Sequence, residues 1–174
     1  EIGHVNQGAI NMVGCTESSN NLFANMNVHL VGKSTTRGDG VAFNAGEFLK
    51  RAPFPTRTSN PIAVSRLYFQ LYLYFHVAKK DITFYPRLFE ALRKDRITKG
   101  YITYGKDDQL KFAEKCGEIA QMDLSEFFEA WGFFVPMESL NVGDYGTYLV
   151  TLTKEEIEAS RARMQQYTKK GGHL

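Results

Sequence analysis

The stretch EIGHVNQGAINMVGCTESSNN, residues 1–21, predicts two helices joined by a turn. Apolar side chains recur at helical spacing over residues 1–13, and Gly14 offers a stop for that first helix. Thr16 can then cap a second helix over residues 17–31. Because the connection is short, we expect the two helices to pack against each other as an antiparallel pair.

Most of the remaining chain also has a helical pattern. Asn60-Pro61 is a favourable start for the most apolar helix, and Asp123–Glu126 and Thr153–Glu156 read as capping boxes. Further helices are expected over residues 42–50, 81–96 and 107–119. Residues 136–146 are expected to be irregular. The expected fold class is therefore mainly α, a helical subdomain with at most a short strand near 148–152.

The composition bounds the class of protein. With 174 residues, 43% of them hydrophobic, the chain can bury the core of one domain, or at most one and a fraction. The formal net charge is only +2 and no run of five like charges occurs, which argues against a dedicated nucleic-acid binder. No apolar stretch is long enough for a transmembrane helix. Cys15 and Cys116 could form a disulfide or remain two buried thiols, and both readings stay open.

Glu1 and His4 carry the chemistry of the opening stretch. They are three residues apart, so both can face the same side of a helix. A histidine directly before Glu1 would complete the pattern H-E-x-x-H, in which two histidines one turn apart bind Zn²⁺ and the glutamate serves as general base. The sequence begins inside this pattern, so we expect the natural chain to continue upstream of Glu1.

Glu17 is the candidate for the third protein ligand that a hydrolytic zinc site requires. It lies at the start of the second helix, which the helical pair would bring back against His4. Asn21 follows four residues later on the same inner face, where its amide could orient a ligand histidine. Each signal read singly has a plainer explanation, such as a first-turn glutamate that interacts favourably with the helix dipole. The Glu1–His4 pair, Glu17 and Asn21 occur together at these spacings, and this combination favours a metal site.

Other side chains are weaker candidates. Trp131 and its neighbouring phenylalanines could form a sugar-binding platform, but a core cluster is the stronger reading. Cys15 has no base nearby in the sequence and is read as a packing residue. A tyrosine could stabilise the oxyanion of a hydrolytic reaction, but the sequence does not choose one. The candidates are Tyr68, Tyr72, Tyr74, Tyr101, Tyr104, Tyr145 and Tyr148.

The residues of the opening stretch resemble the enhancin-like, M60-type zinc peptidases. Members of that family carry H-E-x-G-H and, after a gap, a glutamate in an E-x-x-N-N context. Here Glu1–Gln7 matches the first element short of its leading histidine, and Thr16–Asn21 matches the second. Residues 123–134, DLSEFFEAWGFF, are similar to a segment that follows the catalytic helices in the family. The resemblance spans about residues 1–135, expected to be the C-terminal helical part of the peptidase domain, with residues 136–174 as a C-terminal extension.

The resemblance implies a zinc-dependent endopeptidase of the gluzincin type that acts on glycosylated, mucin-like proteins. It implies Glu1 as general base and acid, His4 and Glu17 as zinc ligands, and Asn21 as a supporting residue behind them. It also implies an extracellular or cell-surface bacterial protein whose partner is its glycoprotein substrate. Since the first histidine ligand is not in this sequence, we expect the chain by itself to bind Zn²⁺ weakly or not at all and to be inactive.

The alternative is a non-catalytic helical module that binds a partner or a glycan and merely retains motif letters. The residue encoded directly before Glu1 separates the two hypotheses, because only a histidine there completes the two-imidazole site.

Overall fold

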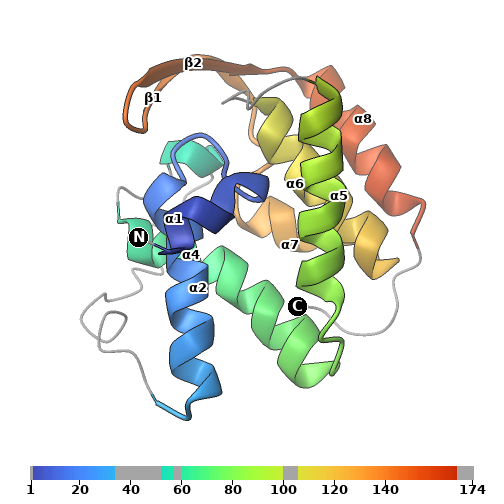
Figure 1. Cartoon of the computed structure of the whole chain (residues 1–174). Coiled ribbons are helices and arrows are strands. Elements are labelled where there is room, and N and C mark those ends of the chain that lie inside the picture. The colour runs from blue at the N-terminus through green and yellow to red at the C-terminus, as the bar shows by residue number, and fades with distance from the viewer. Residues whose placement is uncertain (1, 34–51, 57–59, 100–105, 168–174) are drawn as a thin grey trace.

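The computed structural model describes residues 2–33, 52–56, 60–99 and 106–167 (Figure 1). The helix expected over 42–50 and the candidate base Glu1 lie outside these residues. In chain order the elements are α1 (Ile2–Asn6), η1 (Gln7–Ala9), α2 (Thr16–Leu30), η2 (Phe54–Thr56), α4 (Pro61–Leu71), η3 (Tyr72–Ala78), α5 (Phe84–Lys99), α6 (Lys106–Ala120), α7 (Ser125–Ala130), β1 (Met137–Gly143), β2 (Thr147–Leu152) and α8 (Lys154–Gln165).

The mainly α class is confirmed, and helix packing organises the molecule. α2 packs along α4, α5 packs along α6, and α8 contacts both α6 and α7 (Figure 1). The π-helical turn η3 continues α4 directly. Within the described ranges, no helix combines the length and apolarity needed to cross a lipid bilayer.

The first helix is shorter than predicted. α1 ends at Asn6, and the 3₁₀ turn η1 follows it, with the N–H groups of Ile10 and Asn11 both donating to the carbonyl of Gln7 at 2.8 and 3.0 Å. The residues from Ala9 to Val13 are all buried. After the 3₁₀ turn the chain therefore enters the core as a non-helical segment, although its apolar residues continue the helical pattern.

Two of the four predicted helix caps form as expected. Thr16, predicted to cap the second helix, is instead its first helical residue, because Cys15 occupies the N-cap position. The Asn60 side chain accepts from the N–H groups of Ile62 and Ala63, and Pro61 occupies the first helical position. The capping box at Thr153–Glu156 is present in full at the start of α8. At α7 the pattern differs: Asp123 Oδ1 accepts from the N–H of Ser125 at 2.9 Å, and Leu124 occupies the N-cap position.

A β-hairpin stands where an irregular segment was expected. β1 pairs antiparallel with β2, from Met137 opposite Leu152 to Gly143 opposite Thr147. The strand predicted near 148–152 is therefore β2, whereas β1 was missed. β1 lacks a regular alternation because the register shifts between Met137 and Leu140, where Ser139 has a φ of 47°.

The core is built largely from aromatic rings between α4, α6 and α7. Phe112, Phe128 and Phe133 are at most 1% exposed, and the Phe128 ring lies 6.0 Å from Phe112 and 4.8 Å from Phe133. Fully burying such a side chain contributes about 1.5–3 kcal/mol relative to leaving it in water. Trp131 is 3% exposed and donates its indole N–H to Gln70 Oε1 at 3.0 Å. Trp131 is thus a core residue, as the stronger sequence reading had it.

Candidate metal centre

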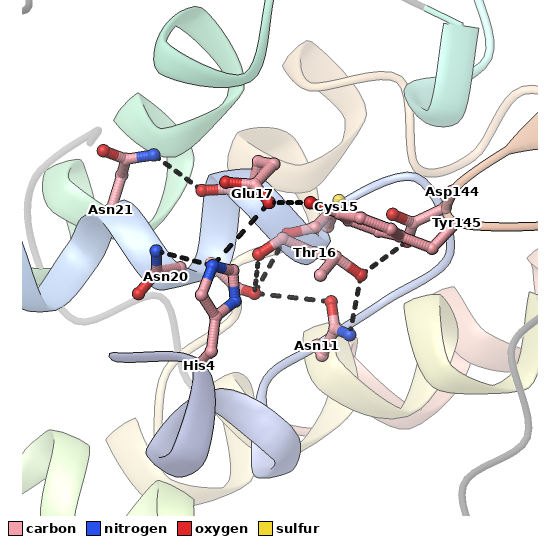
Figure 2. Close-up of polar contacts among 10 residues, drawn as sticks. His4, Asn11, Cys15, Thr16, Glu17, Asn20, Asn21, Asp144 and Tyr145 are labelled. Atoms are coloured by element: carbon pink, nitrogen blue, oxygen red, sulfur yellow. Dashed lines mark hydrogen bonds and ion pairs between the residues drawn. The ribbon is translucent and has the colours of Figure 1, made fainter. Parts of the chain in front are cut away.

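His4 on α1 and Glu17 on α2 face each other across the two helices (Figure 2). His4 Nε2 lies 3.7 Å from Glu17 Oε1, and both side chains are partly exposed. Two ligands of a tetrahedral zinc ion, each about 2.0–2.2 Å from the metal, lie about 3.4 Å apart. The two side chains therefore need to move only slightly to share one ion.

Gly3 explains how α1 comes so close to α2. A Cβ atom at Gly3 would lie 1.8 Å from Asn20 Oδ1 and 3.1 Å from the Asn20 main-chain oxygen. The absence of a side chain at Gly3 thus leaves room for Asn20 beside His4. Asn20 Nδ2 lies 3.1 Å from His4 Nε2, so the amide is the donor and the ring nitrogen the acceptor (Figure 2).

Asn21, expected to orient the histidine, is placed differently. Its Nδ2 donates to the main-chain oxygen of Glu17 at 2.6 Å, one turn earlier in α2. The amide that meets the His4 ring belongs to Asn20, the adjacent residue. One residue along a helix turns a side chain by about 100°, so neighbouring asparagines point in different directions. Asn21 supports the backbone of Glu17, whereas Asn20 occupies the Nε2 lone pair of His4, which must be released before that nitrogen can bind a metal.

A side chain from the β-hairpin caps the start of α2. Asp144 Oδ2 accepts from Thr16 Oγ1 at 2.9 Å (Figure 2). The same oxygen accepts from the N–H of Gly14 at 3.0 Å. Asn11 Nδ2 also donates to Thr16 Oγ1 at 3.1 Å. Cys15, at the N-cap position, makes no side-chain cap of its own. A carboxylate near the first turn of a helix interacts favourably with its dipole, so Asp144 does from a distance what a local cap does elsewhere.

Tyr145, the next residue of the hairpin, reaches the candidate ligand itself. Its hydroxyl donates to Glu17 Oε1, the same oxygen that faces His4 (Figure 2). The sequence offered seven tyrosines and no means of choosing among them. The contact of Tyr145 with Glu17 joins residues 128 positions apart, so no local pattern records it. It is a contact with a candidate ligand, not the oxyanion role for which the tyrosines were considered.

Both cysteines are free and buried, so of the two readings left open by the sequence the pair of thiols is correct. Burial raises the pKa of the Cys15 thiol to about 12. Burial likewise raises the pKa of Cys116. Cys15 lies beside the candidate site, and its burial disfavours the reactive thiolate form by raising the pKa.

The donor atoms of His4 and Glu17 fit zinc, but a zinc site in an enzyme needs a third protein ligand. An imidazole nitrogen and a carboxylate oxygen are both ordinary zinc ligands. Within the described part of the chain, no group of three His, Cys, Asp or Glu side chains gathers closely enough to hold a metal ion. His4 and Glu17 remain predicted ligands, and Glu1 a predicted base.

Comparison with known proteins points to one family. The sequence profile of the family described as peptidase M60, enhancin and enhancin-like matches residues 1–132. A solved metallopeptidase in complex with Tn antigen is similar over 98% of this chain, with a TM-score of 0.84 and 30% identity. A metallopeptidase from Bacteroides thetaiotaomicron is similar over 97% of this chain, with a TM-score of 0.83 and 31% identity. The chain spans only 32% and 29% of the length of these two proteins. No curated protein matches it.

Proposed function

Because this chain belongs to the peptidase M60, enhancin and enhancin-like family, we propose that it carries part of the active site of a zinc-dependent endopeptidase. The observation that supports the proposal best is the pairing of His4 with Glu17, whose Nε2 and Oε1 atoms lie 3.7 Å apart on two adjacent helices. In this proposal His4 and Glu17 hold the zinc together with a histidine encoded directly before Glu1.

Glu1 is the proposed general base and acid. It accepts a proton from the attacking water and returns it to the leaving amine as the peptide bond breaks. Bound zinc supplies Lewis-acid chemistry, which polarises the scissile carbonyl and makes water a stronger nucleophile. Asn21 holds the main chain of Glu17 in place. The Asn20 amide occupies the lone pair of His4 Nε2 and would have to release it when zinc binds there.

The proposed substrates are glycosylated, mucin-like proteins. One similar solved metallopeptidase was captured in complex with Tn antigen, which supports glycan recognition in a protein of this kind. A protein with such substrates would act outside the cell or at its surface. This chain alone, without the first histidine, would bind Zn²⁺ weakly and would not be active.

The test uses the intact protein and an O-glycosylated protein substrate, with zinc content and cleavage rate measured on the same samples. Glu1→Gln removes the basic carboxylate but no zinc ligand, so it should keep the metal and lower the rate by roughly 10²–10⁴-fold. His4→Ala and Glu17→Ala should lose metal and activity together. Glu158→Gln, the same substitution at an exposed position on α8, is the matched control and should behave like the wild type.

Four results would contradict the proposal in whole or in part. Full activity of Glu1→Gln with zinc bound would exclude the assigned base. Cleavage that persists after zinc is removed by a chelator would exclude the metal mechanism. Equal cleavage of the glycosylated substrate and its unglycosylated counterpart would leave the peptidase standing but remove the substrate class. If the wild type neither binds zinc nor cleaves, the non-catalytic binding module becomes the better interpretation.

A further inference from the structure

We propose that the tip of the β1–β2 hairpin, Asp144–Gly146, belongs to the metal centre, and that Tyr145 is a positioning residue that orients the carboxylate of Glu17. The inference rests on the zinc site proposed above. The family profile ends at residue 132, so this hairpin lies outside the segment that carries the recognisable motif. The hairpin also lies within residues 136–174, which were expected to form a C-terminal extension.

The side chains of Asp144 and Tyr145 both bond to the start of the ligand helix. Tyr145 donates its hydroxyl hydrogen to Glu17 Oε1, and Asp144 Oδ2 accepts from Gly14 N–H and Thr16 Oγ1. Glu17 is the residue after Thr16. The hairpin therefore holds α2 at its first turn and the Glu17 side chain at its end, two points that together fix where the carboxylate can lie.

The backbone of Tyr145 is strained in the conformation that makes this contact. Its φ is 53°, in the left-handed region that glycine and asparagine adopt readily and that a bulky residue rarely occupies. The turn is closed by a hydrogen bond from the N–H of Asp144 to the carbonyl of Gly146 at 2.9 Å. The turn itself does not favour a tyrosine at this strained position. The hydrogen bond that its hydroxyl makes to Glu17 is the better explanation for a tyrosine here.

Packing does not explain Tyr145 either. Its side chain is 83% exposed, so the ring buries little apolar surface. A residue kept for stability would be buried or would favour the turn conformation, and Tyr145 is neither. The hydroxyl bond to Glu17 is the feature that distinguishes Tyr145 from an ordinary turn residue. Groups that hydrogen-bond a metal-binding carboxylate fix its orientation, and their loss typically weakens metal binding by roughly 10–100-fold.

The test measures two quantities on the intact protein: the zinc dissociation constant, by competition with a chromophoric chelator, and the thermal midpoint of the zinc-free form. Tyr145→Phe keeps the ring and removes the hydroxyl, so zinc should bind roughly 10–100-fold more weakly with an unchanged midpoint. Tyr74→Phe is the matched control, because it also removes one hydroxyl, bonded there to the Met122 sulfur, on η3. It should leave zinc affinity unchanged.

Tyr145→Asn separates positioning from a merely structural role. Asparagine tolerates a positive φ, so the zinc-free protein should keep or raise its thermal midpoint while zinc affinity falls as in Tyr145→Phe. Asp144→Ala should weaken zinc binding as well, and adding Tyr145→Phe to it should cost little more, because both changes act through the same tip. Cobalt-substituted Tyr145→Phe should also show an altered visible spectrum, since the ligand geometry changes.

Zinc affinity in Tyr145→Phe equal to that of the wild type and of Tyr74→Phe would overturn the inference and leave the zinc site intact. A parallel loss of zinc affinity and thermal midpoint in Tyr145→Asn would also overturn it, because that pattern belongs to a structural residue. If the wild type itself binds no zinc, the proposed function fails first and this inference fails with it.

Discussion

The corner between α1 and α2 buries polar side chains, whereas the centre of the molecule around α4, α6 and α7 buries aromatic rings. In the corner, Gln7, Asn11, Ser18, Ser19 and Asn21 are all buried. Gln7 Oε1 and Ser18 Oγ have no hydrogen-bond partner within the described part of the chain, at a cost of about 1–3 kcal/mol each. Burial of aromatic rings stabilises the fold, whereas the hydrogen bonds of the corner fix the positions of its side chains. We therefore expect mutations in the two regions to affect stability and side-chain position separately.

Phe128→Ala should have the largest effect on stability and none on the metal site. Phe128 is fully buried between Phe112 and Phe133, so its removal leaves a cavity as well as losing buried area. We expect the unfolding free energy to fall by about 3–5 kcal/mol, measured by chemical denaturation. The folded fraction should bind zinc like the wild type. A loss of zinc affinity in that fraction would show that the two regions are coupled.

Gly3→Ala should act in the opposite sense, with a smaller effect on stability and a large effect on the site. The new Cβ would meet Asn20 Oδ1 at 1.8 Å, so Asn20 or α1 must move. Overpacking of this kind costs about 1–3 kcal/mol. His4 follows Gly3 directly on α1, so this movement would displace His4 from Glu17, and the zinc affinity of the intact protein should fall too. Gly8→Ala is the matched control, because a Cβ there meets nothing within 4 Å. Equal zinc affinity in Gly3→Ala and Gly8→Ala would show that the close crossing is not needed.

The two buried cysteines test whether water is excluded from the corner as fully as from the core. Cys15 lies in the corner and Cys116 lies in the core. Burial raises the pKa of Cys15 to about 12 and also that of Cys116. An unfolded chain ionises such thiols from about pH 8.5, while the folded protein keeps them neutral. The unfolding free energy should therefore fall as pH rises above that value, by about 1.4 kcal/mol per pH unit and thiol.

Denaturation of reduced protein at pH 8.0 and 9.5 measures this slope. Cys15→Ala and Cys116→Ala should each remove a similar share of it. A smaller share for Cys15 would show that water reaches the corner. The corner and the aromatic core would then differ in hydration as well as in the polarity of their buried side chains.

Thr153→Ala should have the smallest effect and sets the scale for a change outside both regions. Thr153 caps α8 through a complete capping box with Glu156. Its loss should cost about 1 kcal/mol of unfolding free energy and leave zinc affinity unchanged. A change in zinc affinity here would mean that α8 also supports the site.

The same contrast explains which parts of the structure the sequence could predict. Asn60-Pro61 and Thr153–Glu156 are local signals, complete within four residues, and both helices begin where those signals place them. The approach of His4 to Glu17 was also predictable, because a short connection forces two helices together. α1 was predicted too long because a run of apolar residues that is buried on every side has the same letters as a helical face.

The parts that were missed depend on contacts between distant residues. β1 has an irregular alternation and is recognisable only through its partner β2. Tyr145 and Asp144 gain their roles from residues 128 to 130 positions away, and Asn20 differs from Asn21 only in the direction its helix gives it. Local patterns record none of these relations. The candidate ligands could be found from spacing, while the residues that support them could not.

The distance along the chain between the hairpin tip and α2 also has a consequence for timing during synthesis. Ribosomes add roughly 5–20 residues per second, so the 128 residues between Glu17 and Tyr145 take roughly 6–26 seconds to make. Throughout that interval a nascent chain already possesses the helix that carries Glu17 but not the tyrosine that bonds to it. Within this stretch of chain, the helix that carries Glu17 therefore leaves the ribosome well before the residue that bonds to it is made.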